Sequence, residues 1–260
     1  MREPVYKPHE YDIHTMYRFL LRPRWLALHV TVVATIALMI NLGLWQLRRH
    51  NERVDFNKVV AARIESQPVE LTKLLDEMRT GTIQPADAEW LNVMVSGQYL
   101  TAQTISAVNR SQGGVSGYDP LTPLKIGDST SPTIILVNRG FLAQSVATPE
   151  PPVGEVKIYG RVRISETRRL GQISDPQDGI LAEFITINLQ RISRQIVNLN
   201  TDVYIEALES EPADFGELSL IAPPNFSNGP HLSYTAQWFI FSVFVASGWV
   251  VVVRRKIKSG

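Results

Sequence analysis

The chain of 260 residues contains no cysteine. This absence excludes a disulfide framework, a thiolate nucleophile, an iron–sulfur cluster and any copper or zinc site built on thiolates. It leaves the redox compartment open. No basic patch interleaved with aromatic residues is present, so nucleic acid is not an expected partner. The sequence also lacks a repeat of fixed period, which argues against a repeat array.

Charged residues are missing from two long apolar segments. Trp25–Leu47 holds about 23 residues, and Tyr234–Val253 holds about 20; at a rise of about 1.5 Å per residue, each can cross a hydrocarbon core of about 30 Å. The first segment is followed by Arg48 and Arg49 rather than by a small-residue cleavage site. This pattern indicates an uncleaved membrane anchor rather than a signal peptide.

Basic residues near the ends of the two segments predict the orientation of the chain. Lysine and arginine beside a span favour the cytoplasmic side, and both termini carry several of them. Arg48, Arg49, Arg53 and Lys58 oppose this orientation, but nothing basic lies immediately before the second segment. We therefore expect both tails in the cytoplasm and residues 48–230 outside.

The patterning predicts a membrane protein of the α+β class, with two transmembrane helices flanking one strand-rich extracytoplasmic domain. The expected parts are a cytoplasmic tail at 1–24, helices at 25–47 and 231–253, the domain at 48–230 with a proline-rich linker at 212–230, and a basic cytoplasmic tail at 254–260. The first helix should continue into water until Pro68 stops it. A small barrel and a sheet with short helices both remain open.

Alternating apolar residues and turn signals place the elements of the domain. Strands are expected in 90–99, 104–109, 134–137, 156–162, 184–189 and 203–208, and short helices in 69–78 and 190–196. Residues 134–137 are apolar without a break, which is typical of a strand buried on both faces.

The outer end of the first helix carries the candidate site residues Trp45, Gln46, Arg49 and Arg53. Trp45, Arg49 and Arg53 follow a spacing of i, i+4, i+8, which predicts one stripe rising out of the bilayer. We call this end of the helix the first mouth.

The start of the second helix carries the candidate site residues His231, Tyr234, Gln237 and Trp238. His231, Tyr234 and Trp238 share a face if the helix already includes His231. If the two helices are antiparallel neighbours, the two mouths form an aromatic, basic cleft that bears a histidine.

Simpler interpretations exist for each of these residues. Tryptophan and tyrosine collect at membrane surfaces because they are amphipathic, and arginines there bind lipid phosphates. Gln46 and Gln237 fit interhelical hydrogen bonds, and a lone histidine beside a span is commonly an ordinary interface residue.

Four motifs occur in order along the chain. They are Gly43-x-Trp45-Gln46-Leu47-x-Arg49-x-x-x-Arg53, Gly117-Tyr118 with Leu121–Leu124, Val137–Phe141, and Asn228-x-Pro230-His231-Leu232-x-Tyr234-x-x-Gln237-Trp238. Together they resemble the Surfeit locus protein 1 family, whose members are assembly factors of haem–copper cytochrome oxidase. Leu142, Ala143, Thr235 and Arg53 depart from the usual pattern.

The resemblance implies a bacterial plasma-membrane protein that is not an enzyme and helps to mature cytochrome c oxidase. Its implied cofactor is haem a, bound transiently, with His231 as the axial ligand of the haem iron. Arg49, Arg53 or Arg139 would pair with the propionates. The implied partners are the oxidase catalytic subunit, haem a synthase and membrane lipid.

The sequence also offers other histidines as ligands and other functions for the chain. His50 is conceivable as a second axial ligand, whereas His29 should lie at the opposite end of the first helix; His9 and His14 are poorly spaced for a helical metal pair. One alternative function is a structural or accessory partner of the oxidase that does not touch haem. Another is an envelope hydrolase, but no G-x-S-x-G motif supports a nucleophile.

Overall fold

The computed structural model describes residues 17–127, 132–168, 171–214 and 216–259. The expected tail at 1–24, including His9 and His14, lies largely outside the described residues. The chain divides into two compact units, which we call the helix pair (Met1–Asn57 with Phe226–Gly260) and the domain (Lys58–Asn225).

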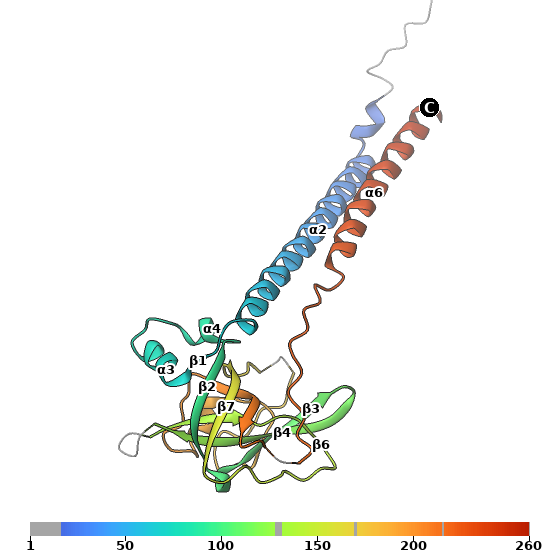
Figure 1. Cartoon of the computed structure of the whole chain (residues 1–260). Coiled ribbons are helices and arrows are strands. Elements are labelled where there is room, and N and C mark those ends of the chain that lie inside the picture. The colour runs from blue at the N-terminus through green and yellow to red at the C-terminus, as the bar shows by residue number, and fades with distance from the viewer. Residues whose placement is uncertain (1–16, 128–131, 169–170, 215, 260) are drawn as a thin grey trace, which may run out of the picture. The chain divides into compact units, whose positions relative to one another are not determined.

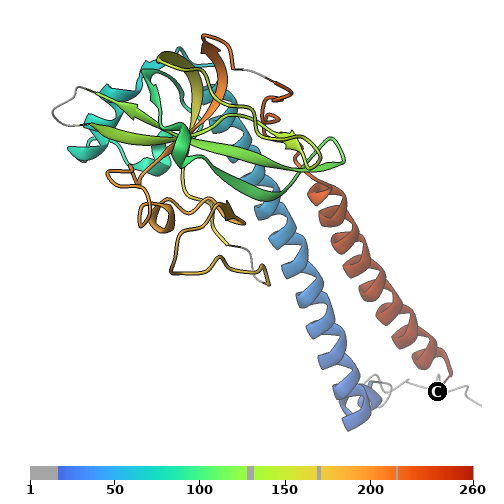
Figure 2. The same ribbon diagram turned by 90° about the horizontal axis from the view of Figure 1, so that it is seen from below.

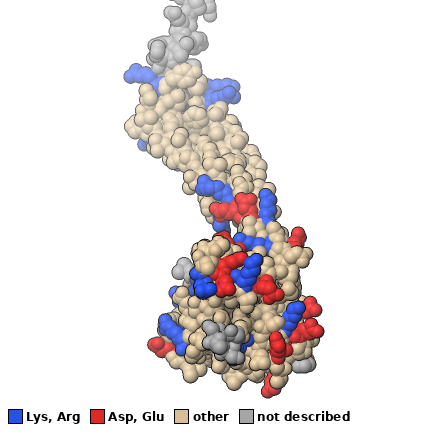
Figure 3. All heavy atoms as spheres, turned by 60° about the vertical axis from the view of Figure 1, so that its left-hand side comes forward, with Lys and Arg blue, Asp and Glu red and all other residues tan. Residues whose placement is uncertain are grey.

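The helix pair is formed by α2, Pro23–Ile64, and α6, His231–Ser259, with the short 3-10 helix η1, Arg18–Leu21, before them. Both long helices are apolar and long enough to cross a membrane. Figure 3 shows their middle part as a surface without charged side chains. As expected, α2 continues beyond its apolar run and ends before Pro68.

The two helices run antiparallel and side by side (Figures 1 and 2). Gly43 makes the close approach possible, because a Cβ at this position would lie 3.1 Å from the Phe239 ring. Near the other end, Trp249 Nε1 donates a hydrogen bond to His29 Nδ1 over 3.0 Å. Small residues and interhelical hydrogen bonds are the usual means of joining helices in an apolar environment.

The described residues of the domain form nine strands. They are β1 (Val69–Glu70), β2 (Asn92–Tyr99), β3 (Ile105–Gln112), β4 (Val115–Ile126), β5 (Thr133–Asn138), β6 (Leu142–Ala143), β7 (Glu155–Arg163), β8 (Glu183–Phe184) and β9 (Tyr204–Glu211). The strand order is β1-β2-β7-β9-β5-β4-β3-β8, with β6 on β4. Because β2 also pairs with β4, the hydrogen-bonded path β2-β7-β9-β5-β4 closes on itself.

Four short helices accompany the strands. They are α3 (Leu71–Arg79), α4 (Pro85–Ala88), α5 (Leu189–Ile192) and the 3-10 helix η2 (Thr101–Gln103). Residues 69–78 were expected to be helical, and the structure confirms this from Leu71 onward. The one or two helical turns predicted near 190–196 correspond to α5.

Two apolar clusters form the core of the domain, and β5 contributes to both. Ile135 and Val137 pack in the cluster under α3, whereas Ile134 and Leu136 pack in the cluster with α5. Successive side chains of a strand point to opposite faces, so a strand buried on both sides reads as an unbroken apolar run. The structure thus confirms the doubly buried strand predicted at 134–137.

The strand predicted at 184–189 is wrong beyond Phe184, because only Glu183 and Phe184 pair with β3. The next main-chain N–H groups are taken by carboxylates instead of by a neighbouring strand. Asp175 accepts hydrogen bonds from Ile185 and Thr186, and Glu166 accepts one from Ile187. Side chains that bond to the backbone in this way compete with strand pairing.

Gly160 offers a test of the packing between β7 and β9. A Cβ at this position would lie 2.6 Å from the main-chain oxygen of Glu206 and would overlap the Ile205 side chain. We expect Gly160→Ala to lower the free energy of unfolding by about 2 kcal/mol or more, because overpacking against backbone is poorly relieved. Urea unfolding of the full chain in detergent, followed by tryptophan fluorescence, measures the change.

Val153→Ala is the matched control, since this side chain is 92% exposed. Its free energy of unfolding should stay within about 0.5 kcal/mol of wild type. Equal stability of Gly160→Ala and wild type would contradict the tight packing described for this position.

Candidate functional site

The first mouth and the start of α6 meet through a hydrogen bond between Gln46 and His231. Gln46 Oε1 lies 2.9 Å from His231 Nδ1. One turn along α6, the Thr235 hydroxyl donates to the main-chain oxygen of His231 over 3.0 Å and approaches that of Gly43 at 3.5 Å. The partner of Gln46 across the helices is therefore His231, whereas Gln237 is exposed.

The face of α2 that meets α6 differs from the predicted stripe. Gly43, Gln46, Arg53 and Asn57 all make contacts toward α6 or the chain before it. Their spacings of three, seven and four residues follow one side of a helix. Within the predicted stripe, only Arg53 lies on this face.

The remaining aromatic and basic candidates lie on the outside of the helix pair. Trp45 and Tyr234 are exposed, and Trp238 packs edge-on against Phe241 with 6.2 Å between ring centroids. Arg49 is also exposed and pairs with Glu52 over 2.8 Å. These side chains are positioned to meet whatever surrounds the helices rather than to hold the two helices together.

The hydrogen bond from His231 defines its available nitrogen. In the neutral imidazole, with the amide oxygen of Gln46 as acceptor, Nδ1 carries the proton and Nε2 keeps its lone pair. Gly229 lies beside Nε2, and a Cβ there would come within 3.3 Å of that nitrogen. Gly229 has a φ of 68°, which favours glycine in any case. The ring thus presents an unprotonated nitrogen with a small neighbour.

A short segment before α6, Phe226–Gly229, is tied to α2, and we call it the mouth loop. Asn57 Nδ2 donates to the main-chain oxygen of Phe226 over 2.7 Å and to Asn228 Oδ1 over 2.9 Å. Arg53 Nε donates to the main-chain oxygen of Ser227 over 3.3 Å. Asn57 is not among the site residues predicted from the sequence, although its spacing from Gln46 and Arg53 places all three on one helical face.

The other histidines of the helix pair have different environments. His29 Nδ1 accepts a hydrogen bond from Trp249, so its proton lies on Nε2, and it sits near the far end of α6 from His231, as expected. His50 follows Gln46 by one turn, and its Nδ1 is buried without a hydrogen bond to the described residues. Of His29 and His231, only His231 presents a lone pair on Nε2.

Arg139, the remaining candidate, belongs to the domain. Its buried guanidinium forms a two-bonded ion pair with Asp214, in which Nε lies 2.7 Å from Oδ2. Nη1 also donates to the main-chain oxygen of Pro149 over 2.8 Å. Arg139 therefore anchors two loops of the domain to the end of β5.

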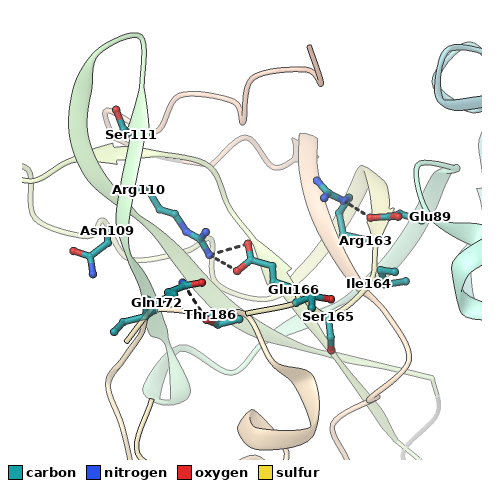
Figure 4. Close-up of a pocket in the computed structure, with 12 residues that line it drawn as sticks. Glu89, Asn109, Arg110, Ser111, Arg163, Ile164, Ser165, Glu166, Gln172 and Thr186 are labelled. Carbon is teal, nitrogen blue, oxygen red and sulfur yellow. Dashed lines mark hydrogen bonds and ion pairs between the residues drawn. The ribbon is translucent and has the colours of Figure 1, made fainter. Parts of the chain in front are cut away.

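The domain also contains a polar cavity of about 850 Å³ that the sequence did not predict (Figure 4). Arg110 and Glu166 point toward one another across it, and the Arg110 guanidinium lies 3.0 Å from the Glu166 carboxylate. On another side, Arg163 pairs with Glu89 and stacks on the Trp90 ring, 3.9 Å from its centroid. Fixed opposite charges line the cavity.

A second cavity of about 380 Å³ shares Arg110, Arg163 and Glu166 with the first and reaches Asp119 and Glu206. Burial raises the pKa of Asp119 to about 6, although the nearby Arg110 guanidinium lowers it. Burial likewise raises the pKa of Glu206 against the pull of Arg163. Isolated charged residues within apolar strands were the available signal, but a single sequence does not show which of them face inward.

Comparisons with known proteins relate this chain to a family. The model of the SURF1 family matches residues 33–243, which include the domain and part of each long apolar segment. The chain belongs to the SURF1 family.

Relatives of this SURF1 family chain occur in bacteria and in Xenopus tropicalis. An uncharacterized SURF1-like protein of Mycobacterium bovis is 30% identical over 93% of this chain and 90% of its own length. A SURF1-like protein of Rickettsia felis is 26% identical over 88% of this chain and 98% of its own length. Surfeit locus protein 1 of Xenopus tropicalis is 27% identical over 56% of this chain and 50% of its own length.

Asp119 predicts a pH-dependent difference in stability. The pKa of Asp119 is about 6 in the folded chain, against an ordinary value of 3.8. Between these two pH values the folded chain holds a proton that the unfolded chain releases. This stabilisation is fully present below about pH 4 and is lost as pH rises through about 6. Relative to wild type, Asp119→Asn should gain about 3 kcal/mol of unfolding free energy between about pH 3.5 and pH 7.

Urea unfolding at a series of pH values, followed by tryptophan fluorescence, measures this difference. Asp178→Asn, an exposed site, is the control and should track wild type at every pH. A difference between Asp119→Asn and wild type that does not change with pH would contradict the raised pKa.

Proposed function

We propose that this SURF1 family chain is a non-enzymatic assembly factor of haem–copper cytochrome c oxidase that holds haem a at the mouth of its helix pair. The family is known generally for cytochrome oxidase assembly factors. The observation that carries the haem proposal is the 2.9 Å contact between Gln46 Oε1 and His231 Nδ1. This contact supports an imidazole whose Nε2 is available to a metal.

The residues at the mouth fit the chemistry of a haem. When bound, haem a supplies an iron that takes a neutral imidazole as an axial ligand. His231 would provide that ligand, and Gln46 would fix its tautomer, as partners of metal-bound histidines commonly do. Trp45, Tyr234, Gln237 and Trp238 would contact the macrocycle.

The basic residues near the mouth would serve the propionates or lipid. Arg49 is exposed beside the mouth, and Arg53 is directed at the mouth loop. Guanidinium groups pair well with carboxylates and phosphates. Arg139 would join this set only by giving up donors that now hold Asp214.

The same proposal places α2 and α6 across a bacterial plasma membrane, with both termini in the cytoplasm and the domain outside. Apolar side chains exposed along both helices, including Val30, Val33, Val243 and Phe244, support a lipid environment. The oxidase catalytic subunit would receive the haem, and haem a synthase would supply it.

A second candidate function is an accessory partner of the oxidase that does not bind haem. The Gln46–His231 contact favours it to the extent that an interhelical hydrogen bond needs no ligand to explain it. Stoichiometric co-purification with mature oxidase, without additional haem, would support this function over haem delivery.

Replacing His231 tests the ligand directly. The wild-type chain purified in detergent from a host that makes haem a should carry a haem absorption band. His231→Ala should lose most of this band, while His29→Ala, the matched control on the other helix, should retain it. Equal haem content and equal oxidase maturation in wild type and His231→Ala would remove His231 from the proposal.

The tautomer of His231 can be measured without haem. Nitrogen-15 spectra of the haem-free chain should show the proton of His231 on Nδ1 and that of His29 on Nε2, because their Nδ1 atoms make hydrogen bonds of opposite sense. Gln46→Leu should move the His231 proton to Nε2, and Gln46→Glu, which keeps an acceptor, should leave it on Nδ1.

If the tautomer of His231 is unchanged in Gln46→Leu, Gln46 does not fix that tautomer. That result would leave the identity of the ligand to the absorption measurement.

A further inference from the structure

The mouth loop ends directly beside the His231 ring. Its last residue, Gly229, is so close that a Cβ there would lie 3.3 Å from Nε2 and 3.4 Å from Cδ2 of that ring. The Gly229 N–H also donates to the Ser227 hydroxyl over 3.2 Å, which folds the end of the loop into a turn. The position of the mouth loop therefore decides how much room there is at His231 Nε2.

Asn57 of α2 holds the other end of the mouth loop. A single amide nitrogen, Nδ2, donates to the main-chain oxygen of Phe226 over 2.7 Å and to Asn228 Oδ1 over 2.9 Å. Because a main-chain oxygen can only accept, the donor side of the Asn57 amide must face it. We call these two hydrogen bonds the latch.

The surroundings of Asn57 show that the latch is its main contribution. Asn57 is only 9% exposed, whereas its apolar neighbour Phe56 is 43% exposed, which reverses the usual distribution of polar and apolar side chains. Asn57 Oδ1 is buried without a hydrogen-bond partner among the described residues, and such a group is costly. This buried amide therefore acts through the two bonds that Nδ2 makes.

Arg53 supplies a weaker tie to the same loop. Its Nε donates to the main-chain oxygen of Ser227 over 3.3 Å, at an exposed position. Longer and solvent-exposed hydrogen bonds contribute less than short ones shielded from water. The latch at Asn57 is thus the stronger of the two ties.

We propose that Asn57 is a positioning residue of the His231 site, whose latch holds the mouth loop against α2 and thereby limits access to His231 Nε2. The inference deepens the proposed function and rests on it, because it assigns to the loop control over the entry of an axial ligand. Release of the latch lets Gly229 move away from the imidazole edge. A ligand would then enter through an open form of the loop that is a minor species while the latch is made.

A role in joining the two helices is a different role, and the contacts separate the two. The helices are joined by the hydrogen bonds of Gln46 with His231 and of Trp249 with His29. The latch instead binds residues of the loop that precedes α6. Loss of the latch should therefore free the loop and leave the helix pair joined.

Diethyl pyrocarbonate, which reacts with the unprotonated nitrogen of a neutral imidazole, measures access to Nε2 without haem. The full chain in detergent is treated at pH 8, where an ordinary histidine is uncharged, and modification is followed by mass spectrometry. Asn57→Leu, which nearly keeps the side-chain volume but removes the donor, should raise the rate at His231 about tenfold, because two hydrogen bonds are lost. His29 in the same samples should react at an unchanged rate.

Three further variants make the test specific. Asn51→Leu replaces an exposed asparagine of the same helix and should leave both rates unchanged. Asn228→Ala removes one bond of the latch and should raise the rate at His231 about threefold. This variant also tests the latch if Asn57→Leu does not fold. The double variant Asn57→Leu with Asn228→Ala should react no faster than Asn57→Leu alone, because both changes break the same bond.

Two outcomes would overturn the proposal. An unchanged rate at His231 in both Asn57→Leu and Asn228→Ala would mean that the mouth loop does not limit access. An equal rise at His231 and at His29 would assign Asn57 to the stability of the whole helix pair.

The latch and the haem proposal can fail separately. A raised rate at His231 in Asn57→Leu supports the latch even if the purified wild-type chain carries no haem band. A haem band that depends on His231, together with an unchanged rate in Asn57→Leu, would retain His231 as the ligand and overturn the latch.

Discussion

The helix pair depends on hydrogen bonds between polar side chains in otherwise apolar surroundings. Where water is scarce, a polar side chain must find its partner on the neighbouring helix, and this requirement allows few alignments of the two helices. Gln46 with His231 and His29 with Trp249 meet this requirement near the two ends of the pair. Between them, Gly43 and Phe239 permit close contact, so register and distance are set together.

In the domain, buried charged side chains must likewise find partners. The strands of its closed path pack against an apolar cluster on each face, yet Arg161, Glu206 and Asp119 are buried in the same strands. Burial of charged groups is tolerated when they are paired, and Glu206 is paired with both Arg161 and Arg163. Arg110 in turn pairs with Asp119 and Glu166, so the network of buried ion pairs extends to β3 and β4.

Much of the fold follows from patterns that a single sequence displays. The two apolar segments and the doubly buried β5 are unbroken apolar runs, and α3 places Leu71 and Leu74 on one face. The strand β4 was not predicted because Pro120 and Pro123 lie within it, and proline lacks the N–H that a strand normally donates. At the mouth, the sequence named Gln46 and His231, which are in contact, but the face of α2 that turns toward α6 carries Gly43, Gln46 and Asn57 in place of the predicted Trp45–Arg49 stripe.

The mouth loop carries a consequence for the order in which this protein is made. Its hydrogen bond from Asn57 to Phe226 joins residues 169 positions apart, with the whole domain between them. Contacts at such separation form late, because the intervening chain must first become compact. During synthesis His231 therefore reaches Gln46 only after the whole domain has been translated, so that a chain ending before α6 lacks the contact that joins the two helices at this end.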